Sequence, residues 1–323
     1  MASAPASTLK VFVPAGGAGL GQRVCRELGV PAGAIGQDLF EDGERSAWPL
    51  EDVDGCDACV VQSLHADPLG SVHDKLCQLL FFIGALNDAG AARVIAVVPY
   101  LAYARQDRQT RPRGPVATRY VAALIEAAGA DVVITVDVHN VAALQNAFRC
   151  RTVNVEAAPL FVDRVAPPAE KAAVTVVAPD AGAIPRAARF RQALSAALGQ
   201  PVAAAFAEKH RDGHQLSGGL LVGEVEGRHV VIVDDMIGTG ATIARAAGAC
   251  RKAGAMTVDA VATHGLFTAG AQVVLAGAVG RLWVSDTVPP FRIEQGPLRE
   301  MLRVAGIAPL LADAIRAVHG ARD

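Results

Sequence analysis

Short apolar runs rich in valine and isoleucine alternate with alanine-rich stretches along most of the chain. Such alternation is typical of strands that take turns with helices. It predicts an α/β protein whose sheets are mostly parallel. The predicted strands have the sequences LKVFVPA, ACVVQSL, RVIAVVPY, DVVITVDVH, AVTVVAPD, HVVIVDD, DAVATHG and RLWVSDT.

An Ala-Gly-Ala sequence precedes three of these strands, and each time a polar residue stands ten positions after the glycine. A glycine at such a place ends a helix in a left-handed cap, and the next strand carries its polar terminus to the carboxyl edge of the sheet. The three polar residues are Tyr100, His139 and His264. Because open α/β sheets bind ligands at that edge, we expect functional residues there.

The repeats fall in both halves of the chain, which predicts two similar α/β domains. A stretch rich in proline and small residues, EAAPLFVDRVAPPAEKAAV, separates them, and we place the boundary near residue 157. The domains then cover residues 1–157 and 158–323. The last segment, GPLREMLRVAGIAPLLADAIRAVHG, predicts one or two amphipathic helices that pack against the domain or a neighbouring subunit. Their apolar stripe consists of Leu310, Leu311, Ile315 and Val318.

Composition and charge narrow the class of protein. No stretch of the chain reaches the roughly 18 uncharged apolar residues of a membrane span. Its first residues lack a basic segment followed by a sustained apolar one, so we expect a soluble, cytoplasmic protein that does not bind a membrane. A net charge of -2 and an isoelectric point near 6.4 argue against a broad nucleic-acid surface, but they leave room for a local anion site.

The six cysteines are too few and too scattered for a disulfide scaffold. Cys56 and Cys59 form a single C-x-x-C sequence, which is a redox pair or half of a zinc site in some proteins. Since there is no second pair and Cys59 begins an apolar run, we favour a packing role at the edge of a strand.

The most specific chemical signal follows the apolar run 230–233. The adjacent acids Asp234 and Asp235 come first, and a turn rich in glycine and threonine follows them. Such a turn directs backbone N–H groups at a phosphate, while adjacent carboxylates accept hydrogen bonds from sugar hydroxyls. A solvated acidic turn is the alternative, but it does not explain why a stretch rich in glycine and threonine follows the acids directly. We therefore predict a sugar-phosphate site whose phosphate-binding residues are Gly238, Thr239, Gly240, Ala241 and Thr242.

The stretch VIVDDMIGTGAT resembles the phosphoribosyl-pyrophosphate loop of type I phosphoribosyltransferases. Further motifs, in the same order along the chain, narrow the resemblance to the ribose-phosphate diphosphokinase family. These motifs are LFEDGE (39–44), VVPYLAYARQDRQTRP (97–112), TVDVH (135–139), APDAG (178–182), EKHR (208–211), THGLF (263–267) and VSDTVP (284–289). The resemblance implies two tandem phosphoribosyltransferase-like domains. It also implies transfer of pyrophosphate from Mg-ATP to the anomeric hydroxyl of ribose 5-phosphate, which yields phosphoribosyl pyrophosphate and AMP.

By this resemblance, Lys209 and Arg211 are the catalytic cations, whereas on sequence context alone a solvated charge cluster is the usual reading of Lys-x-Arg. His210 stands between them, where the family usually has arginine. His139 and Asp180 are expected to hold Mg²⁺ or its waters. A hard cation favours carboxylate oxygen, so Asp180 is the more natural direct ligand. Asp137 is a candidate helper on the same face of the strand.

The resemblance assigns two groups of residues to ATP. One group offers a guanidinium to phosphate and an amide to the base, and the other offers an aromatic ring and acceptors to adenine. The first consists of Arg105, Gln106 and Asp107, and the second of Phe40, Asp42 and Glu44. In the family the second loop serves ATP on a neighbouring subunit. We therefore expect a homo-oligomer built from dimers, such as a hexamer.

The sequence departs from the family pattern at several places. Gly238 stands where the bacterial form usually has an acid, Ala241 and Ala183 replace glycines, and the segment after His139 differs. Two alternative hypotheses therefore stay open. One is a catalytically weak paralogue that regulates a true synthetase, and the other is a phosphoribosyltransferase that consumes phosphoribosyl pyrophosphate.

Overall fold

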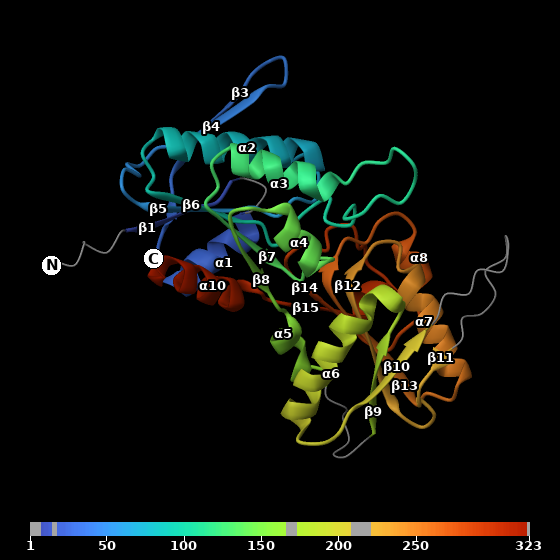
Figure 1. Cartoon of the computed structure of the whole chain (residues 1–323). Coiled ribbons are helices and arrows are strands. Elements are labelled where there is room, and N and C mark those ends of the chain that lie inside the picture. The colour runs from blue at the N-terminus through green and yellow to red at the C-terminus, as the bar shows by residue number, and fades with distance from the viewer. Residues whose placement is uncertain (1–7, 15–17, 166–172, 208–220, 322–323) are drawn as a thin grey trace. The chain divides into compact units, whose positions relative to one another are not determined.

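The computed structural model describes residues 8–14, 18–165, 173–207 and 221–321 (Figure 1). It divides the chain into two compact units. The first unit comprises residues 1–155 and 308–323, and the second comprises residues 156–307. The transition near residue 156 lies beside the boundary that the sequence suggested, whereas the last segment of the chain returns to the first unit.

The first unit is built on a six-stranded parallel sheet with the order β2-β1-β5-β6-β7-β8. In this order the strands are β2 (Ala32–Gly33), β1 (Leu9–Phe12), β5 (Asp57–Val61), β6 (Arg93–Val97), β7 (Val132–Val136) and β8 (Arg151–Val155). Its helices are α1 (Ala18–Leu28), α2 (Val72–Asp88), α3 (Ala117–Ala127), α4 (Val141–Ala147) and α10 (Ala308–Gly320). A separate antiparallel hairpin consists of β3 (Ile35–Leu39) and β4 (Arg45–Pro49). In Figure 1, α2 and α3 cover one face of the sheet and α1 and α10 cover the other.

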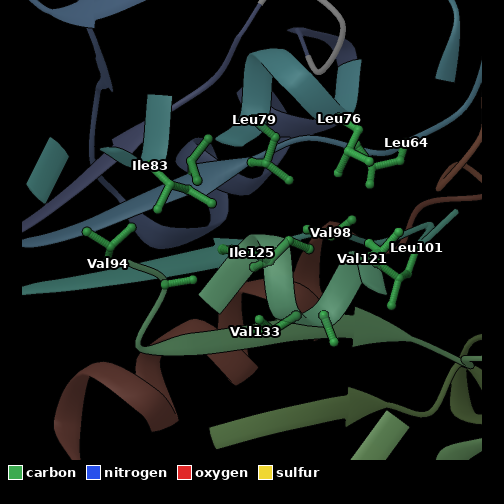
Figure 2. Close-up of a cluster of buried hydrophobic side chains, with 14 of the residues drawn as sticks. Leu64, Leu76, Leu79, Ile83, Val94, Val98, Leu101, Val121, Ile125 and Val133 are labelled. Atoms are coloured by element: carbon green, nitrogen blue, oxygen red, sulfur yellow. The ribbon is translucent and has the colours of Figure 1, made fainter. Parts of the chain in front are cut away.

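Figure 2 shows the core between this sheet and the helices α2 and α3. Leu79 and Ile83 from α2 meet Ile125 from α3 over Val94 and Val133 of the strands, and all of them are buried. Fully burying a side chain of this kind stabilises the fold by about 1.5–3 kcal/mol. The apolar runs seen in the sequence therefore form the layer that holds the strand ends in place.

A buried ion pair fastens α10 to the amino end of the same sheet. The Asp57 carboxylate accepts a hydrogen bond from Arg93 Nη2 at 2.5 Å and lies 2.6 Å from His319 Nδ1. Arg93 also donates to the carbonyl of Ala321 at 3.2 Å. Burial alone would raise the pKa of Asp57, but the hydrogen bonds from Arg93 and His319 lower it overall.

The second unit is built on a seven-stranded sheet with the order β11-β10-β9-β12-β13-β14-β15. All neighbours are parallel except β10 and β11. In this order the strands are β11 (Leu221–Val222), β10 (Ala203–Ala207), β9 (Val174–Ala178), β12 (His229–Ile237), β13 (Thr257–Gly265), β14 (Leu282–Ser285) and β15 (Leu302–Ala305). Its helices are α5 (Ala158–Val162), the short 3-10 turn η2 (Ala181–Ala183), α6 (Ile184–Leu198), α7 (Ala241–Lys252), α8 (Ala271–Leu275) and α9 (Pro297–Met301). The predicted α/β class with mostly parallel sheets is confirmed in both units.

The prediction for the last segment was wrong in two respects. Residues 302–305 form the edge strand β15 between α9 and α10, and Leu310 is only half-buried. The strand pairs with β14, but Arg303 interrupts its apolar residues, so its sequence shows no continuous apolar run. Leu311, Ile315 and Val318 do form the buried stripe of α10.

Cys56 and Cys59 both carry free thiols. Cys59 is fully buried within β5, and this burial raises the pKa of its thiol, which makes the thiolate needed for redox or metal chemistry unfavourable. The packing role fits this position. Within the part of the chain that the structure describes, no helix combines the length and apolarity needed to cross a bilayer.

Candidate functional site

The carboxyl ends of three neighbouring strands in the second unit carry the polar residues of the candidate site. Asp180 follows β9, Asp234 and Asp235 lie near the end of β12, and His264 lies near the end of β13. Parallel strands that are neighbours in a sheet end at the same edge, so the register brings these residues to one side. The expectation of a polar carboxyl edge is met in this unit.

The two acids lie inside β12, because the strand continues through Ile237 beyond the apolar run. Asp235 is only 3% exposed. Arg186, in the first turn of α6, places Nη1 at 3.6 Å from Asp235 Oδ1 and at 3.9 Å from Asp234 Oδ1. Two adjacent carboxylates thus share one guanidinium.

The electrostatics of the pair depend on this arginine. Burial raises the pKa of Asp234 well above its ordinary value of 3.8, and the neighbouring Asp235 raises it further. Arg186 acts in the opposite direction and lowers that pKa. The backbone N–H of Asp235 also donates to Asp234 Oδ1 at 2.9 Å, which favours the ionised form. Arg186 was not predicted from the sequence. Its position six residues after Asp180, at the start of a helix, could have indicated it.

The turn 238–242 joins β12 to α7 and has the geometry of an anion site. Gly240 is the N-cap of α7 and adopts a left-handed conformation with φ 80°. The first intrahelical bond runs from Ala244 N–H to the Gly240 carbonyl, so the N–H groups of the preceding turn have no acceptor within the helix. Thr268 N–H, after β13, donates to the Gly238 carbonyl at 3.1 Å and braces the turn. The arrangement can hold a phosphate beside the acids.

Asp180 lies immediately after β9 and caps the short turn η2, where its Oδ1 accepts from Ala183 N–H at 3.2 Å. Among the described residues, no group of three or more His, Cys, Asp or Glu is placed to hold a metal ion. Mg²⁺ is usually bound through one or two carboxylates together with waters and substrate phosphates, not by a cage of protein ligands. A single strand-end carboxylate such as that of Asp180 therefore fits this cation.

In the first unit, Phe40, Asp42 and Glu44 lie in the turn between β3 and β4. Phe40 is 50% exposed, and its N–H donates to the Glu44 carbonyl at 2.9 Å. Asp42 Oδ1 accepts a hydrogen bond from Glu44 N–H at 3.1 Å, so one oxygen of this carboxylate stabilises its own turn. The hairpin presents all three side chains at its exposed tip.

Arg105, Gln106 and Asp107 lie between β6 and α3. Arg105 and Gln106 are exposed, whereas the Asp107 carboxylate accepts a hydrogen bond from Asn140 Nδ2 at 2.7 Å. His139, directly before Asn140, is exposed at the end of β7. The structure therefore brings the loop 105–107 next to the turn that carries His139.

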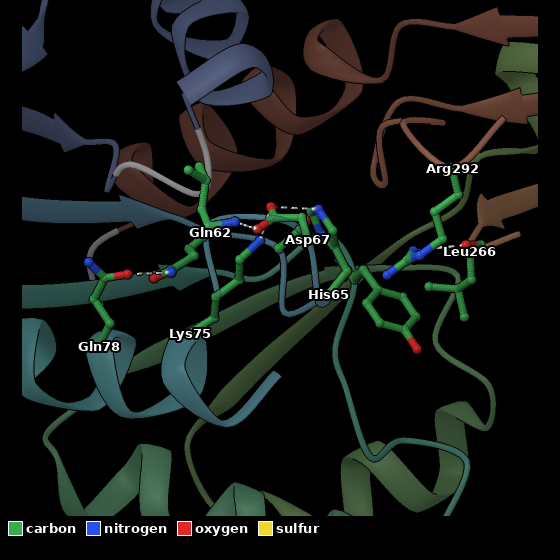
Figure 3. A network of polar contacts seen from close by, with 10 residues as sticks. Gln62, His65, Asp67, Lys75, Gln78, Leu266 and Arg292 are labelled. Atoms are coloured by element: carbon green, nitrogen blue, oxygen red, sulfur yellow. Dashed lines mark hydrogen bonds and ion pairs between the residues drawn. The ribbon is translucent and has the colours of Figure 1, made fainter. Parts of the chain in front are cut away.

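A buried polar network follows β5 in the same unit and was not anticipated from the sequence (Figure 3). Lys75 and His65 both approach the Asp67 carboxylate, and Gln62 donates to Gln78 at 3.2 Å. Burial would raise the pKa of Asp67, but hydrogen bonds from Lys75 and from the Leu69 N–H lower it overall. This network fixes the turn that leads into α2.

The predicted catalytic residues Lys209 and Arg211, and His210 between them, lie outside the described residues. The other predicted residues fall into two sets, one in each unit. The first unit carries Phe40, Asp42, Glu44, Arg105, Gln106, Asp107 and His139, and the second carries Asp180, Asp234, Asp235, Gly238, Thr239, Gly240, Ala241 and Thr242.

Comparison with known proteins finds similarity across nearly the whole chain. Residues 9–129 match the N-terminal domain of ribose phosphate pyrophosphokinase, and residues 217–322 match the phosphoribosyl synthetase-associated domain. A putative ribose-phosphate pyrophosphokinase 2 from Lactococcus lactis is 35% identical over 322 residues, which cover 98% of this chain and 94% of that protein. The ribose-phosphate pyrophosphokinase of Clostridium perfringens is 33% identical over 317 residues, 96% of this chain and 94% of that protein.

A solved structure gives the same result. The crystal structure of phosphoribosylpyrophosphate synthetase from Mycobacterium smegmatis superposes with a TM-score of 0.86 at 34% sequence identity. The superposition covers 97% of this chain and 99% of that one. Because the similarity spans both units, it favours the pyrophosphokinase reading over a transferase that needs only one such domain.

Proposed function

This chain belongs to the ribose-phosphate pyrophosphokinase family, and we propose that its second unit binds the ribose 5-phosphate that the family's reaction consumes. The enzyme transfers a pyrophosphoryl group from ATP to the anomeric hydroxyl of that sugar and forms phosphoribosyl pyrophosphate and AMP. The observation that carries the proposal is the continuous element β12, turn and α7, which places two carboxylates directly before a helix N-terminus.

In this site the 5-phosphate lies against the turn 238–242, where backbone N–H groups and the positive end of α7 favour an anion. The ribose hydroxyls donate to the acids. Asp234 is the more accessible of the two carboxylates, while Asp235 is more deeply buried beside Arg186. Asp234 therefore contacts the sugar directly, and Asp235 and Arg186 set its charge and orientation.

ATP binds to the first unit's residues. Arg105 pairs with a phosphate, Gln106 reads the base edge, and the exposed ring of Phe40 stacks on adenine. The exposed tip of the β3–β4 hairpin supports its use by ATP on a neighbouring copy, so the protein works as a homo-oligomer built from dimers, such as a hexamer. We place the enzyme in the cytoplasm, with no nucleic acid or membrane as partner.

Mg²⁺ is the expected cation, with Asp180 as a direct ligand and His139 as a contact to the ion or its waters. When bound, the cation neutralises charge on the ATP phosphates. The chain's own task is to orient the sugar hydroxyl toward the transferred phosphorus and to hold cations near the charge that develops there. Lys209 and Arg211 supply those cations. No covalent intermediate with the protein is required, because the nucleophile is a hydroxyl of the substrate.

A direct assay tests this function. Purified protein is incubated with Mg-ATP and ribose 5-phosphate, with and without inorganic phosphate, and both AMP and phosphoribosyl pyrophosphate are followed. We expect the two products to form in equal amounts. If neither forms, while the protein raises the activity of an authentic synthetase on mixing, the regulatory alternative is correct instead.

Replacing Arg186 with methionine is expected to raise KM for ribose 5-phosphate by about tenfold at pH 7, equivalent to about 1.4 kcal/mol. Methionine keeps much of the side-chain volume but removes the charge that lowers the pKa of Asp234. A larger fraction of Asp234 is then protonated, and the neutral carboxyl accepts a hydrogen bond from a sugar hydroxyl more weakly than the carboxylate does. Because loss of the guanidinium raises that pKa further, ionisation returns only as the pH rises. The KM of the variant, measured from pH 7 to pH 9, should therefore fall with rising pH more than that of the wild type.

Arg189→Met is the matched control for this prediction. Arg189 lies in the same helix, but its Nε contacts Glu156 at 3.1 Å and not the acidic pair. Its KM and pH profile should match the wild type. An Arg186→Met enzyme with unchanged KM across this pH range would show that the guanidinium does not control the acids.

A further inference from the structure

Asn140 makes two side-chain hydrogen bonds of opposite sense, and they join two parts of the first unit. Its Oδ1 accepts from Ala143 N–H at 3.1 Å, so that it caps α4. Its Nδ2 donates to Asp107 Oδ2 at 2.7 Å. The first bond orders the helix after His139, and the second reaches the loop 105–107.

This loop is fastened at its other end by Thr118, a buried residue in the first turn of α3. Thr118 Oγ1 donates to the Tyr103 carbonyl at 2.9 Å, and Thr118 N–H donates to the Gln106 carbonyl at 3.3 Å. Gln106 N–H donates a hydrogen bond to the same Tyr103 carbonyl at 2.9 Å. Tyr103 itself has a left-handed backbone with φ 65°, a conformation that costs free energy and persists only where surrounding contacts enforce it.

The two fastenings act on different parts of the loop. Thr118 holds the backbone from Tyr103 to Gln106, whereas Asn140 holds the side chain of Asp107. Arg105 and Gln106 lie between these points and remain exposed. A loop held in this way presents its exposed side chains in a fixed direction before a ligand arrives, which lowers the entropy cost of binding.

We propose that Asn140 is a positioning residue for ATP. By holding the Asp107 carboxylate it fixes the direction in which Arg105 and Gln106 meet the nucleotide, and it links this loop to the turn that carries His139. The inference rests on the proposed function, since it takes the loop 105–107 as part of the ATP site.

A role for Asn140 in capping α4 alone predicts different results for substitutions at this position. If Asn140 only caps α4, any good N-cap residue should replace it without effect on the substrate. Serine and aspartate are as favourable as asparagine at an N-cap. Serine, however, is too short to reach Asp107, and aspartate offers no donor to it. These substitutions separate the cap from the bond to the loop.

The first experiment is steady-state kinetics of Asn140→Ser. We expect KM for ATP to rise about fivefold to tenfold, while kcat at saturating ATP and KM for ribose 5-phosphate stay within about twofold of the wild type. The midpoint of thermal unfolding should stay close to that of the wild type, because serine keeps the cap. An unchanged KM for ATP would overturn the proposal.

The second experiment reverses the polarity of the bond. Asn140→Asp alone sets two carboxylates against each other and should raise KM for ATP more than serine does. In the double variant Asn140→Asp, Asp107→Asn, the new amide donates to the new carboxylate and the cap is kept. We expect Asn140→Asp to impair ATP binding less in the Asp107→Asn background than in the wild type, and equal impairment in both backgrounds would overturn the proposal. A wild-type protein that forms no AMP would instead contradict the proposed function itself.

Discussion

Replacing Lys209 with alanine is expected to lower kcat by about 10²- to 10³-fold and to change KM for ribose 5-phosphate by less than about threefold. Negative charge moves onto the transferred phosphates as the reaction proceeds, so a cation that meets them matters most in the transition state. Initial rates of AMP formation at saturating substrates, together with the KM for each substrate, measure the effect.

Lys252→Ala serves as the control, because Lys252 is an exposed cation in the last turn of α7. It should leave kcat unchanged. A Lys209→Ala enzyme that keeps its turnover but loses affinity for the sugar would show that Lys209 binds ribose 5-phosphate in the ground state and is not a catalytic cation.

Gly240→Ala should raise KM for ribose 5-phosphate by about 100-fold. It should also lower the free energy of unfolding by about 2 kcal/mol. Gly240 has a left-handed backbone, which alanine adopts at a cost of about 1–2 kcal/mol. A Cβ at this position would also lie 2.5 Å from Leu275 Cγ, so the turn or α8 must move. Either shift turns the backbone N–H groups away from the phosphate.

Gly238→Ala provides a matched control in the same turn. A Cβ there would meet only Thr268 Oγ1, at 3.8 Å, and the backbone is not left-handed. We expect KM for ribose 5-phosphate to stay within about twofold of the wild type. Equal losses in both variants would mean that the conformation of Gly240 has no special part in binding.

The space at Gly238 also bears on the departure from the family pattern. Since a Cβ is accommodated there, contact at the Cβ does not by itself require glycine at this place, where the resemblance leads us to expect an acid. Relative to an acid, glycine removes a negative charge next to the proposed phosphate site, and contact at the Cβ does not explain the exchange. Ala183, by contrast, is buried, so its methyl group is part of the packing.

The sequence was informative where the residues of the proposed site lie within one continuous stretch. Asp234, Asp235 and the turn 238–242 could be predicted because a strand, a turn and a helix follow one another there. Arg186 could not be linked to the acids in the same way, since it reaches them only through the parallel pairing of β9 with β12. The bond between Asn140 and Asp107 depends in the same way on β6 and β7 being neighbours.

Strands without a continuous apolar run account for most of what was missed in the fold. Polar, charged or glycine residues interrupt the strands of the β3–β4 hairpin and β15, and most of their residues are exposed or half-buried, so they do not stand out from a loop. The strands with continuous apolar runs and the strand-end positions of His139 and His264 were anticipated correctly, because such runs leave a clear pattern.

The return of α10 to the first unit sets the order in which the two units are completed during synthesis. Ribosomes add roughly 5–20 residues per second, and a domain at the N-terminus ordinarily folds first. Here the residues of the second unit emerge before α10 does, so that unit can close while the apolar surface later covered by Leu311, Ile315 and Val318 is still bare. The Asp57–Arg93–His319 contact forms only afterwards. The unit that is translated first is therefore the last to be finished.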